Sequence, residues 1–425
     1  MKIIRAYRTE LDPTRAQIES MLRHAGVARW AYNWGLARRQ SAYWESGATL
    51  DAMKLHKELN RLKRTEFPWL YAVSKCAPQE ALRDLDRAFK NFWRSRRSGK
   101  RCGFPRFKSR KRATRGFRLT GKIHTNHSSI QLPRLGKVRL KERGYLPTVE
   151  AHIISATVSQ RAGRWFVSIR VSEDITPPSN TGPIVGLDVG VSNWFVTSDG
   201  VTYRASSEFA RLERRVARVN RQLSRARAGS ENYKKLSRRL ARLHLRIANI
   251  RSDALHKITT TLARTKSVVV IEDLNVAAMR KNRRLARALS ARSFGMIRQM
   301  LEYKASWYGS KVVVAPRVYP SSKMCSCRGC GHVLRDLPLS QRTFTCTNCG
   351  CSRDRDYNAA LNLRNVAVSS TDTQNACGGD VRPSARWQLP SNRVSEDALS
   401  AFAEERSSVS ITLSRDSAAG LSSRS

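Results

Sequence analysis

The first hundred residues carry one strand pattern followed by a long helical pattern. Apolar and polar side chains alternate over residues 1–10, which predicts a short β-strand. Asp12 and Pro13 follow, and an aspartate cap before a proline at the first helical position is typical of a helix start. Helical periodicity then continues, with interruptions, to about Arg97. We expect most of the aromatic side chains of this stretch to be core residues: Trp30, Tyr32, Trp34, Tyr43, Trp44, Trp69, Tyr71, Phe89, Phe92 and Trp93.

Residues 115–175 are rich in β-type patterning. The segment IISATVSQRAGRWFVSIRVSE has two alternating runs around residues 161–164, which predicts a β-hairpin. The Pro-, Ser- and Asn-rich segment SEDITPPSNTGP, residues 172–183, is typical of a linker and marks the main domain boundary.

The second half alternates buried strands with helices. IVGLDVGVSNWFVTSDGVTYRAS reads as three strands with a turn at residues 199–200. Apolar residues spaced by three and four over 207–262 predict an antiparallel pair of helices with Arg-rich outer faces. SVVVIEDL and SKVVVAPRVYP are two further buried strands, separated by a helix around 293–308, and this order indicates an α/β domain. Residues from about 369 lack periodicity and are expected to be mostly disordered.

Charge narrows the range of partners. The formal net charge is +46 and the pI is near 11.1, and nucleic acid is the usual partner of so basic a chain. A merely solvated surface and a basic membrane-surface protein are the alternatives, but no uncharged apolar run is long enough to span a bilayer. The N-terminal residues show no apolar signal core, so we expect a cytoplasmic, nucleoid-associated protein without a membrane partner.

One basic run is a candidate for direct contact with nucleic acid. The run FPRFKSRKRATR sets Phe104 and Phe107 among cations, a pattern that can grip phosphates while stacking bases. The candidate contacts are Arg106, Phe107 and Lys108, and the alternative is a flexible basic loop.

Carboxylates at strand ends are the candidate catalytic groups. Asp188 lies inside an apolar strand run, Glu272 ends another, and Asp356 is placed to open the last helix. Hydrolysis of a phosphodiester by two Mg²⁺ or Mn²⁺ ions needs oxygen ligands held close together, which three such carboxylates would supply. A strand-end acid is more often an ordinary solvated residue. Asp354 is an alternative third ligand, whereas Asp273 should point to the opposite face from Glu272.

The cysteines indicate a structural zinc site. Cys327-x2-Cys330 and Cys346-x2-Cys349 are separated by fifteen residues, a four-thiolate spacing typical of a zinc ribbon. Cys325 lies beside the first pair and is the alternative to Cys327 as a ligand. Three further cysteines stand alone and are not expected to bind metal: Cys76, Cys102 and Cys377.

These motifs together resemble the TnpB family, proteins carried by bacterial insertion sequences and related to the type V CRISPR effector nucleases. GLDVGVSN, IEDLNVAAM and DRDYNAALNL resemble the three RuvC motifs, and YPSSKMCSCRGCGH with FTCTNCG resembles the zinc ribbon inserted before the third. The resemblance covers about residues 1–368 and implies a multidomain α+β protein. Its implied parts are a split β-barrel wedge domain (1–10 and 113–180), a helical recognition insertion (11–112), an RNase-H-like RuvC nuclease domain (183–368) with the ribbon at about 317–352, and a tail (369–425).

The resemblance also implies an activity. It implies RNA-guided cleavage of double-stranded DNA beside a short motif that the protein reads, with a guide RNA from the transposon end. Asp188, Glu272 and Asp356 would hold Mg²⁺ or Mn²⁺, and one structural Zn²⁺ would occupy the ribbon. Lys75 and Gln79 match positions near the target-adjacent motif. Two other interpretations compete: a transposase that acts in recombination without guide RNA, and a nuclease-inactive RNA-guided repressor.

Overall fold

The N-terminal strand is the central member of an antiparallel sheet. The computed structural model describes residues 1–99, 102–110, 115–148, 152–190, 193–274, 294–338 and 340–375, with side chains to residue 368. Seven strands of this part of the chain pair in the order β2-β6-β7-β1-β5-β4-β3. Their bounds are β1 Lys2–Asp12, β2 Gly116–Leu119, β3 His124–Thr125, β4 Ser129–Leu132, β5 Gly136–Leu140, β6 His152–Arg161 and β7 Arg164–Asp174.

The predicted hairpin is confirmed. β6 and β7 pair up to Arg161 and Arg164, and the intervening Ala162 and Gly163 both have positive φ, as a tight two-residue turn requires. β7 then pairs with β1 from Lys2↔Asp174 to Glu10↔Phe166. The first strand of the chain is therefore hydrogen-bonded to a strand that lies more than 150 residues later in the sequence. β2 and β3 stand at the two ends of the described strand order, and closure into a barrel remains a prediction.

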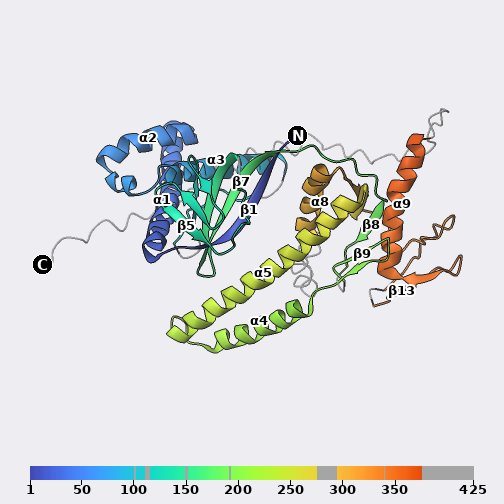
Figure 1. Cartoon of the computed structure of the whole chain (residues 1–425). Coiled ribbons are helices and arrows are strands. Elements are labelled where there is room, and N and C mark those ends of the chain that lie inside the picture. The colour runs from blue at the N-terminus through green and yellow to red at the C-terminus, as the bar shows by residue number, and fades with distance from the viewer. Residues whose placement is uncertain are drawn as a thin grey trace, which may run out of the picture. The chain divides into compact units, whose positions relative to one another are not determined.

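Helices inserted between β1 and β2 share one core with this sheet. Their bounds are α1 Arg15–Ser46, α2 Ala52–Thr65, the 3₁₀ helix η1 Pro68–Ala72 and α3 Cys76–Arg97 (Figure 1). The predicted helix start at Asp12 and Pro13 is wrong by two residues. The strand continues through Asp12, and Thr14 is the cap, because its hydroxyl accepts the Gln17 N–H while the Gln17 side chain accepts the Thr14 N–H.

The expectation for the aromatic residues holds only in part. Tyr32 is buried and four of the ten are half-buried, but the remaining five are exposed: Tyr43, Trp44, Trp69, Tyr71 and Trp93. The core between α1, α2 and α3 is aliphatic instead, with Leu36, Leu55, Leu82 and Leu85 fully buried. These five rings therefore keep surface that is accessible to a partner.

A second sheet carries the strands of the C-terminal half. The order is β10-β9-β8-β11-β12 for the strands that the structure describes there, with β8, β11 and β12 parallel and β9 and β10 antiparallel. The bounds are β8 Val185–Asp188, β9 Phe195–Thr197, β10 Thr202–Tyr203, β11 Val268–Glu272 and β12 Lys311–Ala315. The α/β order predicted for this half is confirmed.

Helices cover both faces of this sheet. Val185, Leu187 and Ile271 face a core shared with α4 Ser207–Arg225, α5 Glu231–Thr265 and α8 Phe294–Tyr308. The alternate residue Val270 faces the other way, onto Leu363 and Ala367 of α9, which spans Arg355–Asn375. Figure 1 shows α4 and α5 as an antiparallel pair and α9 beside β8. The helix pair predicted over 207–262 is confirmed.

A small ribbon precedes α9. It contains the antiparallel strands β13 Thr343–Thr345 and β14 Ser352–Asp354. α9 continues to Asn375, beyond residue 369 where the tail was expected to begin, and the rest of that tail, with Cys377, lies outside the described residues. None of the described helices is both long enough and apolar enough to cross a membrane.

Candidate functional site

Two of the three candidate carboxylates end neighbouring parallel strands. Asp188 is the last residue of β8, and Glu272 is the last residue of β11. The pairing of Ile271 with Leu187 places Glu272 in register with Asp188 at the carboxyl edge of the sheet. Asp356 lies in the first turn of α9, and its charge acts on Asp188 together with that of Glu272. The fold therefore gathers the three predicted acids at one edge.

The surroundings of these acids oppose their ionisation. Burial, and then the charges of Glu272 and Asp356, raise the pKa of Asp188 well above its ordinary value of 3.8. Burial also raises the pKa of Glu272, and burial together with the charge of Asp354 raises that of Asp356. Hard oxygen ligands that repel one another in this way suit a divalent cation, which would supply the missing positive charge.

The two neighbouring acids have other partners. Asp354 is exposed, and its Oδ1 accepts the Tyr357 N–H at 3.0 Å, which is the geometry of a helix cap. Asp273 forms ion pairs with Arg298 and Arg317. Of the two carboxylates that the sequence left open as third ligand, Asp356 is the more buried and the one whose charge acts on Asp188.

Two polar side chains at this edge were not singled out from the sequence. The Ser321 hydroxyl donates to Glu272 Oε1, and the Asn193 side chain donates to Asp356. Both bonds stabilise the charged carboxylate and fix its direction. Serines and asparagines in loops are too common to be recognised by pattern, and only the folded chain brings these two to the acids.

Close packing of α9 on β8 sets the position of Asp356. A Cβ atom added to Gly186 would lie 2.0 Å from the Ala360 carbonyl oxygen and 2.5 Å from the Arg364 nitrogen, both in α9. Only glycine leaves room for the helix backbone at this distance. Gly186 therefore lets the helix that carries Asp356 lie directly against the strand that carries Asp188.

The ribbon gathers four thiols, but not the predicted four. The Sγ atoms of Cys325, Cys330, Cys346 and Cys349 all lie within 4.8 Å of one another. The Cys325–Cys349 and Cys330–Cys346 pairs are both 3.6 Å apart, close to the roughly 3.8 Å expected around a tetrahedral zinc with bonds of about 2.3 Å. Cys327 lies outside this group. The geometry thus favours the alternative first ligand, Cys325, over the residue that the CxxC spacing selected.

Two features of the ribbon fit a structural metal. Its own core is small, with Leu337 and Phe344 as the buried residues other than cysteine. Asn348 Nδ2 donates to Cys330 Sγ at 3.5 Å, and this donor, together with a backbone hydrogen bond from His332, lowers the pKa of the Cys330 thiol to about 6. A thiolate is the form that binds zinc, and zinc replaces a hydrophobic core in segments this small.

Buried asparagines fasten the ribbon to α9. Asn358 Oδ1 accepts the Ser326 N–H at 3.1 Å, and Asn358 Nδ2 donates to the Met324 carbonyl at 2.7 Å. Asn362 Nδ2 donates to the Met324 and Ser321 carbonyls at 2.6 and 2.8 Å. Since Ser321 also bonds to Glu272, the segment leading into the cysteines is part of the support of the carboxylates.

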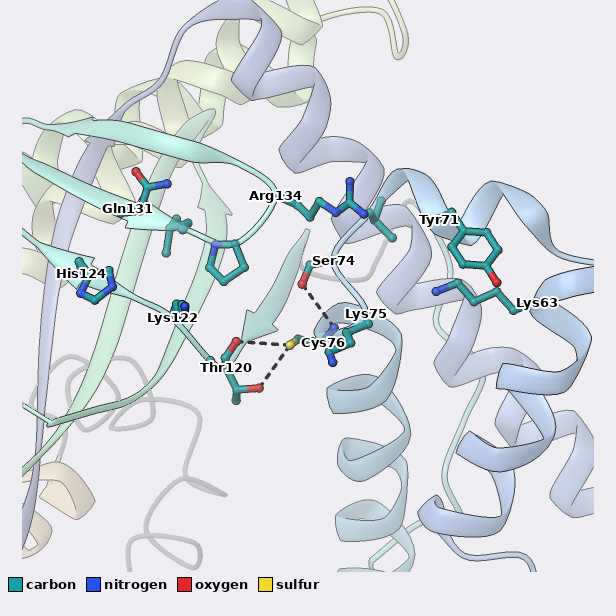
Figure 2. Close-up of a pocket in the computed structure, with 14 residues that line it drawn as sticks. Lys63, Tyr71, Ser74, Lys75, Cys76, Thr120, Lys122, His124, Gln131 and Arg134 are labelled. Atoms are coloured by element: carbon teal, nitrogen blue, oxygen red, sulfur yellow. Dashed lines mark hydrogen bonds between the residues drawn. The ribbon is translucent and has the colours of Figure 1, made fainter.

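A cavity lies between α2, the start of α3 and the loops of the first sheet. It measures about 700 Å³, and Lys63, Lys75, Lys122 and Arg134 line it from four separate segments (Figure 2). Burial and then the charges of Arg134 and Lys75 lower the pKa of Lys63. Such a cluster of cations suits a polyanion. Gln79 lies one turn into α3 and is half-buried, outside the cavity lining.

Hydrogen bonds join the two walls of this cavity. The Cys76 thiol donates to the Thr120 carbonyl and accepts from the Thr120 hydroxyl, both at 3.3 Å (Figure 2). This links the start of α3 to the end of β2, so Lys75 is held at a fixed position beside Thr120 and Lys122.

The three residues of the basic run that were predicted to contact nucleic acid differ in their exposure. Arg106 and Phe107 are exposed, Phe107 by 55 %. Lys108 instead turns onto α1, where its Nζ lies 3.6 Å from the centre of the Tyr32 ring and its backbone pairs with the Asn33 side chain. Residues 102–110 thus lie against the helices, and burial lowers the pKa of Lys108.

The carboxylate site predicts a pH-dependent response to Mg²⁺. The pKa values of Asp188, Glu272 and Asp356 are raised in the folded protein. The protonated acids therefore stabilise the metal-free fold at pH values below the ordinary pKa of a carboxyl group. This stabilisation is lost as pH rises through the raised pKa values. Mg²⁺ held by these acids would need them ionised, so the stabilisation that it adds should grow as pH rises. At a hundredfold excess over Kd it would reach about 2.7 kcal/mol near neutral pH.

The measurement is the shift of Tm on adding Mg²⁺ at neutral and at acidic pH. We expect a clear shift at neutral pH, a much smaller one at acidic pH, and little pH dependence in Asp188→Asn. An equal shift at both pH values in the wild type would contradict a carboxylate site for the ion.

Three family profiles match successive parts of the chain. The profile described as "Probable transposase" (OrfB_IS605) matches residues 166–283, and "Cas12f1-like, TNB domain" matches residues 294–363, which include the ribbon. A third, described as "Helix-turn-helix domain", matches residues 1–48. In the structure that segment is strand β1 followed by the single helix α1.

Curated relatives match over nearly the whole chain. A protein of Streptomyces pristinaespiralis named "Putative RNA-guided DNA endonuclease" is 38 % identical, over 90 % of this chain and 93 % of its own length. InsQ of Escherichia coli K12, which carries the same description, is 34 % identical over 85 % and 92 %. The solved structure "Cryo-EM structure of the Cas12f1-sgRNA-target DNA complex" matches with a TM-score of 0.53 at 13 % identity, covering 85 % of this chain and 99 % of that one. With this extent of identity to full-length relatives, and with OrfB and Cas12f1-like profiles in the expected order, the chain belongs to the TnpB family.

Proposed function

We propose that this protein is an RNA-guided endonuclease that cleaves double-stranded DNA beside a short target-adjacent motif. The observation that carries the proposal is the convergence of Asp188, Glu272 and Asp356 at the carboxyl edge of the second sheet. The names of the two long relatives support the activity, and the net charge of +46 supports a nucleic-acid partner.

In this proposal the three carboxylates hold two Mg²⁺ or Mn²⁺ ions. Bound there, the ions would activate a water and stabilise the leaving oxygen of a phosphodiester. The protein's own groups fix the ligands: Ser321 orients Glu272, Asn193 orients Asp356, and burial keeps Asp188 from solvent.

The ribbon is proposed to hold one structural Zn²⁺ through Cys325, Cys330, Cys346 and Cys349. The ribbon forms hydrogen bonds with α9, and the ion would hold the Met324–Ser326 segment in place against Asn358 and Asn362.

The remaining regions are proposed to bind nucleic acid. The cationic cavity with Lys75, and Gln79 beyond it on α3, would lie near the target-adjacent motif, and Arg106 with Phe107 would contact backbone and bases. Lys108 would act through packing on Tyr32. The guide RNA would derive from the transposon end, and the protein would work in the cytoplasm, on nucleoid DNA.

The domain assignments follow the same proposal. The first sheet would be the wedge domain, helices α1 to α3 its recognition insertion, and the second sheet with its ribbon an RNase-H-like RuvC domain. The fold alone does not separate this function from the two alternatives. A transposase that acts without guide RNA would have the same second sheet, and a nuclease-inactive repressor would have the same fold throughout. The intact acid cluster argues against the repressor.

The proposal predicts that the protein is inert on duplex DNA without RNA. We expect a specific RNA to copurify with it, and we expect nuclease activity to disappear after RNase treatment and to return when that RNA is added back. Joining of transposon ends by RNase-treated protein would instead support the transposase.

A further inference from the structure

The ribbon contains more thiols than one zinc needs. Six cysteines fall within residues 325–351. Besides the four-thiol group, the structure brings together a second group, Cys325, Cys327 and Cys351, whose Sγ atoms also lie within 4.8 Å of one another. Cys325 belongs to both groups. The two cysteines left over from the zinc site are therefore gathered around one of its ligands.

The same turns that build the first group position the second. The Cys330 N–H donates to the Cys327 carbonyl at 3.1 Å, and the Cys346 N–H donates to the Cys351 carbonyl at 2.8 Å. Gly350, with φ of +70°, reverses the chain between Cys349 and Cys351. Cys327 and Cys351 are consequently held by backbone bonds of the two knuckles.

Burial distinguishes the shared thiol from its two partners. Cys325 is buried, only 3 % exposed, and its N–H donates to the His332 carbonyl at 2.8 Å. Cys327 and Cys351 are half-exposed. The second group thus has one ligand inside the ribbon and two at its surface, with a side open to solvent. Three protein ligands and an open position form a chelating site for a thiophilic ion.

We propose that the ribbon binds a second thiophilic d¹⁰ metal ion, such as Zn²⁺, through Cys325, Cys327 and Cys351, with the Cys325 thiolate bridging the two ions. The net charge of such a two-ion cluster equals that of an ordinary four-cysteine zinc site. Six thiolates with two divalent ions carry a net charge of −2, the same as four thiolates with one. The bridge explains why one buried cysteine belongs to two overlapping groups.

The alternative is that Cys327 and Cys351 are ordinary free thiols beside a single zinc. A metal-to-protein ratio separates the two without requiring any variant to fold. The full chain, saturated with Zn²⁺ and freed of unbound ion, should hold about two zinc ions by elemental analysis. Cys327→Ser and Cys351→Ser should each hold about one, and that retained ion would show that the ribbon has folded. Cys102→Ser, which removes an exposed cysteine outside the ribbon, should still hold about two.

Cadmium tests the bridge itself. Loaded with ¹¹³Cd²⁺, the wild type should give two thiolate-rich resonances, and Cys327→Ser should give one. Cys325→Ser should weaken both ions. A wild type that holds one ion when saturated would overturn the proposal. So would a second ion that persists in both Cys327→Ser and Cys351→Ser. Neither outcome depends on DNA cleavage, so the proposed nuclease activity could stand or fall separately.

Discussion

Asp188→Asn is expected to abolish DNA cleavage while leaving nucleic-acid binding nearly unchanged. Asp188 is the most buried of the three acids and the one on which the charges of the other two act. Asparagine has nearly the same shape but removes the negative charge that would hold the ions. Since the ions supply several kcal/mol of transition-state stabilisation, cleavage should fall by about a thousandfold or more. Affinity should persist, because it comes mainly from contacts with phosphates.

Matched variants separate this effect from general damage. Glu272→Gln and Asp356→Asn should behave like Asp188→Asn in cleavage and in binding assays. The adjacent Asp273→Asn, which removes exposed ion pairs with Arg298 and Arg317, should retain most of the activity. Loss of cleavage in Asp354→Asn together with full activity in Asp356→Asn would transfer the third ligand to Asp354.

The Cys346→Ser variant should lose both its zinc and its DNA cleavage activity. The effect on cleavage would be indirect, because Asp188 and Glu272 lie on β8 and β11, outside the ribbon. Cys346 is buried in the four-thiol group, and structural zinc contributes on the order of 10 kcal/mol to folding in small domains. Without the ion the Met324–Ser326 segment should leave Asn358, and Ser321 should no longer orient Glu272. Zinc content and cleavage rate should therefore fall in parallel.

Cys76→Ser is the matched control, because Cys76 is also buried but lies in α3, apart from the ribbon sequence. It should keep its zinc. A Cys346→Ser protein that has lost zinc yet cleaves at the wild-type rate would contradict the coupling between the ribbon and the carboxylates.

The regular elements of this chain were predictable because their patterns are local. The hairpin β6–β7 and the α4–α5 pair each show a periodicity within one element, and the buried strands β8 and β11 are short continuous apolar runs. The acids were predictable for a similar reason. A carboxylate at the end of an apolar strand is conspicuous, and the parallel pairing that aligns Asp188 with Glu272 follows from the α/β order.

What failed depends on contacts between distant segments. The CxxC spacing favoured Cys327, but the turn that bonds the Cys325 N–H to the His332 carbonyl brings Cys325 inward instead. The hydrogen bond from Ser321 to Glu272 joins residues 49 apart in the chain. Asn358 and Asn362 did leave a signal, because these two asparagines one helical turn apart lie among the apolar residues 359–361 and 363, which indicates buried polar partners.

The most direct test of the central claim is to change the guide. Protein reconstituted with RNAs that differ only in the guide segment should be given one duplex that contains a matching target for each, beside the same adjacent motif. The RNA-guided account predicts that the cut moves with the guide and that Asp188→Asn, loaded with the same RNA, binds the new target without cutting it. Cutting at one fixed position whatever the guide, or equal cutting without RNA, would contradict it.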